Sequence, residues 1–289
     1  MNYRHAYHAG GFTDVMKHTI IALLIEALKR KDTPFFVLDT HAGIGRYDLT
    51  AEEAVKTAEA SEGVLRLAGK VVPFELGPYW GVVKAFNKGQ PHGALRWYPG
   101  SPRLVRALMR PTDRLVLAEL HADDAATLAD QFRGDPLVRV QATDGYTAIK
   151  ALLPPAERRG LVLIDPPFEV KDEFALLQRG LKDAWRRWPT GTFALWYPIK
   201  GLAPVREFLD WVKENAPAEA LTADLFVHPA VVDDRLNGCG MLVVNPPWKF
   251  DEQIARVLPF LHETLAQTKG SSALTWLVRE KDLTKRALR

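Results

Sequence analysis

Hydrophobic segments of strand length alternate with amphipathic segments of helical length along most of this chain. Eight segments are predicted strands: 35–39, 115–120, 138–141, 161–165, 193–197, 221–227, 241–245 and 275–278. Such an alternation is typical of a mostly parallel sheet covered by helices on both faces. The near-continuous apolar run from Leu161 to Ile164 fits a central strand that is buried on both sides. The pattern therefore predicts an α/β fold.

The alternation is interrupted once, in the interval from about residue 50 to residue 98. No strand is predicted between Tyr47 and Leu115, and segments 51–67 and 78–87 have helical patterns instead. In open parallel sheets the loops at the carboxyl ends of the strands surround the ligand crevice, so an insertion in the first such loop can shape substrate access. We expect one domain over residues 1–289, with a helical insertion subdomain at 50–98.

Composition narrows the class of protein. The 289 residues are 47% hydrophobic and 25% charged, which is ordinary for a globular protein. The longest apolar run, 19–28, contains Glu26 and is too short to cross a bilayer, and the polar N-terminus does not resemble a signal peptide. One cysteine, Cys239, excludes an internal disulfide and a thiolate metal cage. We therefore expect a cytoplasmic protein with no membrane partner.

The net charge of +3 permits an RNA partner without requiring one. Basic residues cluster at 29–31, at Arg103, Arg106 and Arg110, at 158–159, at 186–187 and in the C-terminal tail. Each cluster taken alone is more often a solvated helix end than a phosphate contact. Charge therefore leaves the kind of partner open.

Acidic residues close four successive predicted strands: Asp39, Glu119, Asp144 and Asp165. Any one of them could simply cap a helix. A carboxylate at such a position can also accept hydrogen bonds from the hydroxyls of a ribose. A row of carboxylates favours a cationic, hydroxyl-rich ligand such as S-adenosylmethionine and would repel a pyrophosphate cofactor.

The first acidic strand end runs into a Gly-x-Gly turn at Gly43 and Gly45. Glycines let the backbone approach a ligand closely. A dinucleotide fingerprint has a third glycine three residues after the second, but Gly45 is followed by Arg-Tyr-Asp. The turn therefore argues against NAD, and a tight turn without a ligand remains an alternative.

The most specific signal is Asp165-Pro166-Pro167-Phe168, directly after an apolar strand. The exocyclic amine of adenine is a poor nucleophile because its lone pair is delocalised into the ring. Asp165 and the carbonyl of Pro166 can accept the two amine protons while the nitrogen becomes tetrahedral. The prolines stiffen this loop, and Phe168 offers a flat face for a flipped-out base. Taken alone, the loop predicts the methylation of an amine, and the exocyclic amine of adenine fits these contacts.

Three other segments need an interpretation. Asn245-Pro-Pro-Trp248 repeats the pattern, but three predicted strands separate it from Asp165, so we interpret it as structural. Near the N-terminus, His5, His8 and His18 have no cysteine or close carboxylate to complete a ligand set, so we expect no metal. Ser101, followed by a proline, is a predicted helix N-cap that could also touch the ligand.

Read together, these segments resemble the RlmJ family of bacterial 23S ribosomal RNA adenine-N6 methyltransferases. The resemblance rests on six strings, in the family's order: Tyr-Arg-His-x-x-His-Ala-Gly with Asp-Val-x-Lys-His (3–18), Leu-Asp-Thr-His-Ala-Gly-x-Gly-Arg-Tyr (38–47), Tyr-Pro-Gly-Ser-Pro (98–102), Arg-Gly-Leu-x-Leu-Ile-Asp-Pro-Pro (159–167), Ala-Leu-Trp-Tyr-Pro (194–198) and Asn-Pro-Pro-Trp-Lys (245–249). They span almost the whole chain up to about residue 280. One departure is Phe168, where the pattern often has tyrosine.

The resemblance implies a Rossmann-like class I methyltransferase with a mostly parallel, seven-stranded type of sheet and a small helical insertion. It implies a monomer that acts on 23S ribosomal RNA, unassembled or early in assembly. It implies that Asp165 engages the target amine and that Tyr3 contacts the RNA base. The implied contacts to S-adenosylmethionine are His18, His41, Ser101, Glu119, Asp144, Gly145 and Asp165.

Three further functions stay open at this point. A DNA adenine-N6 methyltransferase would have the same active-site loop, whereas a protein-glutamine methyltransferase usually has asparagine in place of Asp165. A non-catalytic RNA-binding protein on a methyltransferase fold would be expected to have lost Asp165 or the glycine turn, and both are intact.

Overall fold

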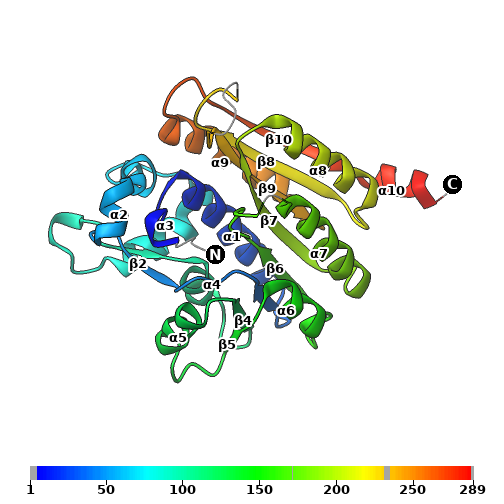
Figure 1. Ribbon diagram of the computed structural model, residues 1–289, viewed down its shortest axis with the longest axis horizontal. Helices are drawn as coiled ribbons and strands as arrows, with labels where there is room; N and C mark the ends of the chain where they lie inside the picture. The colour runs from blue at the N-terminus through cyan, green and yellow to red at the C-terminus, as the bar shows by residue number, and fades with distance from the viewer. Residues whose placement is uncertain (1–4, 171, 231–234, 288–289) are drawn as a thin grey trace.

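An eight-stranded mixed sheet forms the centre of the molecule in the computed structural model, which describes residues 5–170, 172–230 and 235–287 (Figure 1). The strand order is β10-β8-β9-β7-β6-β1-β4-β5. The strands are β1 (Phe36–Asp39), β4 (Arg114–Glu119), β5 (Val138–Ala142), β6 (Gly160–Ile164), β7 (Thr192–Ile199), β8 (Ala220–Phe226), β9 (Gly238–Val244) and β10 (Ser271–Val278). Strands β5, β4, β1, β6 and β7 are parallel neighbours. Strand β9 runs antiparallel to both β7 and β8, and β10 runs antiparallel to β8.

All eight predicted strands are present, and the α/β, Rossmann-like fold is confirmed. The expectation of a seven-stranded type of sheet is wrong, because β10 adds an eighth strand at the edge beside β8. Its residues alternate between exposed and partly buried positions, as expected for an edge strand with one face toward solvent. The central strands β1 and β6 are instead buried throughout.

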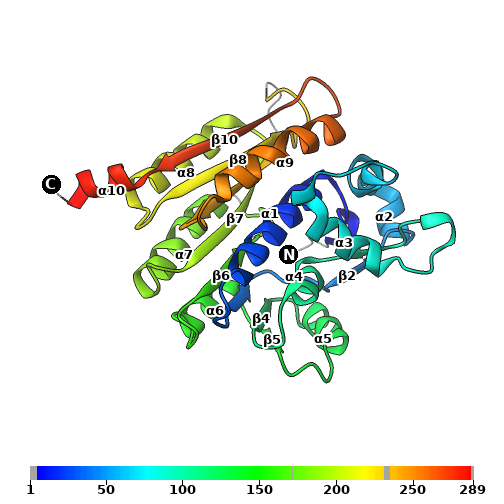
Figure 2. The ribbon, with the colours of Figure 1, turned by 180° about the vertical axis from the view of Figure 1, so that it is seen from behind.

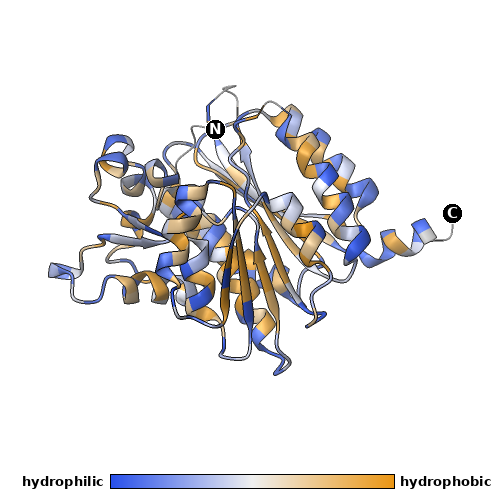
Figure 3. Cartoon of the chain, turned by 60° about the horizontal axis from the view of Figure 1, so that its bottom comes forward, coloured by the Kyte–Doolittle hydropathy of each residue, from blue (hydrophilic) through white to orange (hydrophobic). Residues whose placement is uncertain are grey.

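Helices cover the two faces of the sheet in separate groups (Figures 1 and 2). One hydrophobic core contains residues of α1 (Phe12–Lys29), α3 (Gly77–Phe86), α4 (Ser101–Leu108), α5 (Ala122–Gln131) and α9 (Phe250–Leu265). The other contains residues of α6 (Gly145–Leu152), α7 (Glu173–Arg187) and α8 (Leu202–Asn215). A last helix, α10 (Glu280–Ala287), follows β10. Figure 3 shows the hydrophobic strands enclosed between helices with hydrophilic outer surfaces.

Helix α1 begins at Phe12 and ends at Lys29. Most of its 18 residues are buried, including the charged or polar side chains of Asp14, Lys17 and His18. Those three lie on the first turns, beside the carboxyl ends of the strands, which places charge next to the site described below. In a search of the described ranges, no helix had both the length and the hydropathy for a bilayer span.

Two strands that the sequence pattern did not predict enclose the interval after the first strand. Strands β2 (Arg46–Asp48) and β3 (Trp97–Pro99) pair antiparallel in a sheet of their own. Three residues are too few for an alternation to be recognised, so the prediction of no strand between Tyr47 and Leu115 is wrong. The Asn87 side chain fixes this return, because its oxygen accepts the N–H groups of Arg96 and Trp97.

Between β2 and β3 the chain forms α2 (Glu52–Thr57), α3 and four short 3₁₀ helices, η2 (Glu59–Glu62), η3 (Val64–Leu67), η4 (Phe74–Leu76) and η5 (Pro91–Gly93). A further 3₁₀ helix, η1 (His5–Tyr7), precedes α1. The division of residues 1–289 into one domain with an insertion subdomain at 50–98 stays a prediction.

Candidate active site

A cavity of about 1050 Å³ lies at the carboxyl ends of the parallel strands. Nine residues that the sequence analysis selected line it: His18, His41, Ser101, Glu119, Asp144, Gly145, Asp165, Pro166 and Phe168. A tenth, Tyr3, lies outside the described residues. Residues far apart in the sequence therefore meet in one place, because parallel strands deliver their following loops to the same edge of the sheet.

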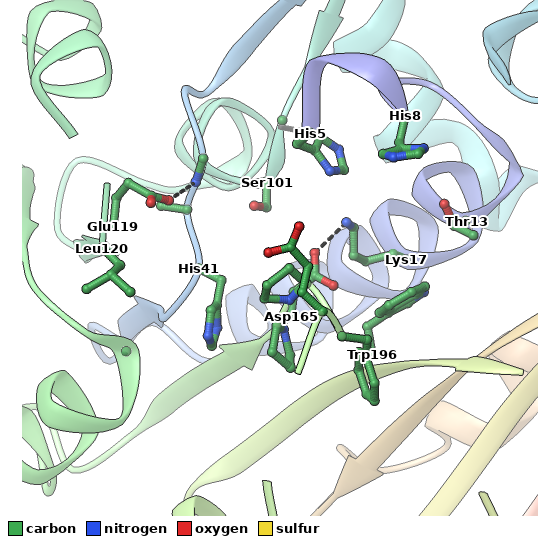
Figure 4. A pocket seen from close by; sticks show the side chains of 18 of the residues that line it. His5, His8, Thr13, Lys17, His41, Ser101, Glu119, Leu120, Asp165 and Trp196 are labelled. Atoms are coloured by element: carbon green, nitrogen blue, oxygen red, sulfur yellow. Dashed lines mark hydrogen bonds and ion pairs between the residues drawn. The ribbon is translucent and has the colours of Figure 1, made fainter. Parts of the chain in front are cut away.

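Asp165 faces the N-terminal part of α1 across this cavity (Figure 4). Its Oδ2 atom lies 2.5 Å from the Lys17 ammonium nitrogen, and the structure gives Oδ1 no partner among the described residues. The same ammonium lies 2.9 Å from Oδ1 of Asp14. Lys17 therefore bridges two carboxylates, one fully buried and one that borders the cavity, and one oxygen of Asp165 remains available to a ligand.

Asp14 is the buried anchor of this arrangement. Its Oδ2 accepts the Gly10 backbone N–H at 2.9 Å and lies 3.0 Å from Nε2 of His5. Burial alone would raise the pKa of Asp14, but the charges of His5 and Lys17 hold it well below its usual range. Asp14 is therefore ionised at neutral pH and fixes the ammonium that meets Asp165.

Asp39 ends β1 immediately beside the cavity and is 1% exposed. Burial raises the pKa of this carboxyl group to about 6, against a hydrogen bond from Ser101 that lowers it, and the negative charge of Asp165 raises it further. The prediction that Ser101 caps α4 is wrong: Gly100 occupies the cap position, and Ser101 begins the helix. The Ser101 hydroxyl is directed to Asp39 instead.

Glu119, the last residue of β4, is held by two backbone groups. Its Oε2 accepts the N–H of Gly43 at 2.8 Å, and its Oε1 accepts the N–H of His121 at 2.9 Å. Asp144 caps α6, because its Oδ2 accepts the Thr147 N–H at 2.8 Å. The capping interpretation thus holds for Asp144, which borders the cavity at the same time.

Two histidines in the cavity wall are neutral at physiological pH. Burial lowers the pKa of His18 to about 3 and that of His41 to about 4. His18 Nδ1 lies 2.8 Å from the Tyr98 hydroxyl, and His41 Nδ1 lies 2.8 Å from the Thr40 hydroxyl. Neither imidazole opposes a cationic ligand. Within the described residues, no cluster of three or more His, Cys, Asp or Glu has a metal-binding arrangement.

Aromatic side chains form the wall beyond Asp165. Phe168 is half-buried and meets Trp196 edge to face, with 5.8 Å between the ring centroids, and meets Phe174 at 5.1 Å. The backbone at Phe168 has φ 52°, in the left-handed region that non-glycine residues adopt with difficulty. The loop therefore holds the ring in one unusual conformation, supported by two neighbouring rings.

Sequence reasoning gave no role to two residues that the structure places beside Asp165. Lys17 was visible as a lysine within an apolar helix, a position where an unpaired charge is costly, and this was a usable signal. Trp196 lies within β7, and alternation along that strand puts it on the same face as Pro198, which also lines the cavity.

Comparisons with known proteins agree on one family. Residues 32–278 match the family described as "Ribosomal RNA large subunit methyltransferase D, RlmJ". Two relatives named "Ribosomal RNA large subunit methyltransferase J" are similar over 282 residues, which is 97% of this chain and 100% of each relative: that of Escherichia coli (strain K12) is 42% identical, and that of Haemophilus influenzae is 38% identical over the same 282 residues. A solved structure, protein LPL1258 of Legionella pneumophila, has a TM-score of 0.85 at 34% identity and covers 93% of this chain and 98% of its own.

Proposed function

The chain belongs to the RlmJ family of ribosomal RNA large subunit methyltransferases, and on this premise we propose that it methylates the exocyclic N6 amine of an adenine in 23S ribosomal RNA, with S-adenosylmethionine as methyl donor. The observation that carries the proposal is the position of Asp165. Its carboxylate borders the cavity beside a rigid Pro-Pro turn, pairs through one oxygen with Lys17, and is followed by an aromatic wall.

The donor set of the cavity fits S-adenosylmethionine. The cofactor supplies an electrophilic methyl group carried on a positively charged sulfur. Each oxygen of Glu119 has accepted one N–H and retains a lone pair, so the pair can receive two ribose hydroxyls. The proposed cofactor contacts are His18, His41, Ser101, Glu119, Asp144, Gly145 and Asp165.

Gly145 supports this assignment through its lack of a side chain. A Cβ atom there would lie 2.3 Å from the carbonyl oxygen of Thr40. The loops that follow β1 and β5 therefore pack backbone to backbone where the cofactor would lie, and any larger residue would push them apart. The neutral state of His18 and His41 fits a cationic ligand equally well.

Asp165 serves in this proposal as a hydrogen-bond acceptor for one proton of the target amine, and the carbonyl of Pro166 accepts the other. These two contacts draw the nitrogen lone pair out of conjugation with the ring and aim it at the methyl group. Lys17 holds Oδ2 of Asp165, which leaves Oδ1 for the amine. The nitrogen loses a proton readily once it carries positive charge, so a strong general base is not required.

The substrate base would lie against the aromatic wall. Phe168 is the proposed stacking residue, with Trp196 behind its edge. Pro166 and Tyr3 complete the proposed substrate contacts. We further propose that the enzyme acts as a monomer in the cytoplasm, on 23S RNA that is unassembled or early in assembly, because a flipped-out base must be reached before ribosomal proteins enclose it.

The test is methyl transfer from labelled S-adenosylmethionine to deproteinised 23S RNA from cells that lack this protein. We expect one N6-methyladenosine per 23S molecule, located by mass mapping, and no label in duplex DNA of matched adenine content. Label in duplex DNA with none in RNA would identify a DNA methyltransferase. No label in either substrate, from a protein that binds the cofactor, would overturn the proposal.

A further inference from the structure

A second cavity, of about 350 Å³, adjoins the first beside the paired strands β2 and β3. The two cavities share the lining residues Ala6, Ile44, Tyr47 and Glu53, so they are neighbours. Figures 1 and 2 show this strand pair between α2 and α5, on the flank of the molecule away from α7 and α8. No residue of β2 or β3 has a role in the proposed methyl transfer.

In this strand pair, two guanidinium groups lie over one indole ring. The Arg46 Cζ atom lies 4.4 Å from the centre of the Trp97 ring, and that of Arg96 lies 4.8 Å from it. Arg96 also donates twice to the Asp48 carboxylate, at 3.0 and 3.1 Å. Arg46 makes no ion pair with any of the described residues. Cation–π contact therefore orients Arg46 while its hydrogen-bond donors stay available.

Arg103 brings a second positive charge close to the second cavity. Its Nε atom donates to Gln131, a lining residue of the second cavity, at 3.1 Å, and its guanidinium lies over Phe132 at 4.6 Å. Burial lowers the pKa of Arg103, the nearby positive charge of Arg46 lowers it further, and the negative charge of Asp135 partly opposes both effects. Like charges at close range raise the free energy of the folded protein unless an anion lies between them.

Two other arginines of this flank are paired with carboxylates. Arg96 is paired with Asp48, and Arg106 is paired with Asp135 at 2.6 Å. Glu53 is the one further carboxylate in the lining of the second cavity, among the described residues. Arg46 and Arg103 make no ion pair with any of the described residues, although the negative charge of Asp135 acts on Arg103. Their guanidinium donors are therefore available to an anion. Guanidinium forks of this kind match the geometry of a phosphate.

We propose that Arg46 and Arg103 bind a backbone phosphate of the substrate RNA, next to the target nucleotide. This inference rests on the proposed function. Both arginines are tied to the cofactor loops: Arg46 follows Gly45 directly, and Arg103 comes two residues after Ser101. A strand whose target base occupies the main cavity continues along the shared lining into the second one. The phosphate contact fixes the register of the strand there and carries no base specificity.

The experiment measures RNA affinity and methyl transfer as functions of salt for the wild type, Arg46→Gln and Arg103→Gln. Each variant should lower RNA affinity about tenfold at low salt and reduce the slope of log K against log salt by about 0.7 to 0.9, the value for one phosphate contact. KM for RNA should rise while kcat changes less than about twofold, because neither side chain touches the reacting atoms. Arg46→Lys, which keeps the charge but loses the fork, should retain the salt slope with weaker affinity.

The matched control is Arg187→Gln, which removes an equal charge from an exposed position on α7 in the other helical layer. It should leave affinity and slope unchanged. Glu53→Gln, which removes the opposing charge, should tighten RNA binding. An unchanged slope in Arg46→Gln, in a preparation whose wild type methylates 23S RNA, would overturn the phosphate contact. Competition by millimolar inorganic phosphate that Arg46→Gln abolishes, with RNA affinity unaltered, would instead identify a free-anion site. A wild type that transfers no methyl group to RNA would count against the proposed function itself.

Discussion

Two loops of this protein have nearly the same sequence and opposite positions. Asp165-Pro-Pro-Phe168 follows β6, which runs parallel to β1 and ends at the cavity. Asn245-Pro-Pro-Trp248 follows β9. This strand runs antiparallel to β7 and therefore ends on the side of the sheet where the parallel strands begin. The direction of the preceding strand therefore decides the surroundings of each Pro-Pro loop.

The surroundings differ in kind. Asp165 is paired with an ammonium and offers an oxygen to the cavity, whereas the Asn245 side chain donates to the Thr190 carbonyl at 2.8 Å. Phe168 is half-buried among rings, whereas the Trp248 side chain is 79% exposed. The interpretation of the second loop as lying away from the crevice agrees with this geometry, but the physical reason is strand direction. In the sheet order β9 is only two places from β6.

The largest contrast is expected from removing the first residue of each loop. Asp165→Ala should lower kcat by about 10³-fold, because an amine without its acceptor stays conjugated, and should leave cofactor affinity within about threefold. Asn245→Ala should leave kcat unchanged and lower stability by roughly 1 to 3 kcal/mol, since the side chain loses its hydrogen bond and alanine must adopt φ 55°. Single-turnover methyl transfer and urea unfolding provide the two measurements. Activity near wild type in Asp165→Ala would refute the mechanism.

The second contrast between the two loops is Lys17, because no lysine among the described residues pairs with Asn245. Lys17→Met leaves Asp14 and Asp165 without their shared partner, so we expect stability to fall by about 3 to 5 kcal/mol and kcat to fall by about 10²-fold. The double variant Asp14→Asn with Lys17→Met should recover much of the stability and none of the rate. Lys29→Met on the same helix, which breaks an exposed pair with Glu26, is the control. Recovery of kcat in the double variant would mean that Lys17 acts only on folding.

The aromatic residues that end the loops should differ less. Phe168→Ala should raise KM for RNA about tenfold, the loss expected for one base stack, and Phe168→Tyr should behave as wild type. Trp248→Ala should change neither KM nor kcat, despite the larger ring and greater exposure. Steady-state kinetics on a 23S fragment separate these outcomes. If Trp248→Ala raised the KM for RNA as much as Phe168→Ala does, RNA would also contact the loop that follows β9.

Much of the first loop's setting could be predicted from the sequence. Four acidic strand ends, a glycine turn and the Pro-Pro loop are local patterns, and a parallel sheet brings such ends together without further information. The strands themselves were predictable because each contains enough apolar residues to reveal its burial. The same reasoning does not predict β2 and β3, because their three-residue pairing depends on the side chain of Asn87, which donates to the carbonyl of Trp97 ten positions later.

Contacts between distant segments were out of reach for the same physical reason. Lys17 and Asp165 are 148 positions apart, and only packing of α1 against the sheet brings them together. Strand direction is likewise a tertiary property: nothing within residues 238–244 states that β9 inserts antiparallel between β7 and β8. The sequence order of the two Pro-Pro loops therefore suggested the right distinction through an incomplete argument.

The smallest expected difference concerns pH. Asp39 is buried beside the cavity and has a pKa of about 6, whereas Asn245, at the opposite ends of the parallel strands, does not titrate. A carboxyl group whose pKa is raised on folding contributes stability that is fully present below its unfolded pKa and is lost as pH rises through the folded value. Between pH 4 and pH 7 the wild type should therefore lose at most about 3 kcal/mol through this group, and Asp39→Asn should lack that loss.

Urea unfolding of both proteins at pH 4.5, 6 and 7.5 measures the difference. Because the charge of Asp165 helps to raise the pKa of Asp39, Asp165→Asn should shift the loss to lower pH, and Asn245→Asp should leave it in place. Identical pH profiles for the wild type and Asp39→Asn would show that Asp39 gains no proton affinity on folding. The two Pro-Pro loops would then differ in chemistry only through Asp165 and its ion pair with Lys17.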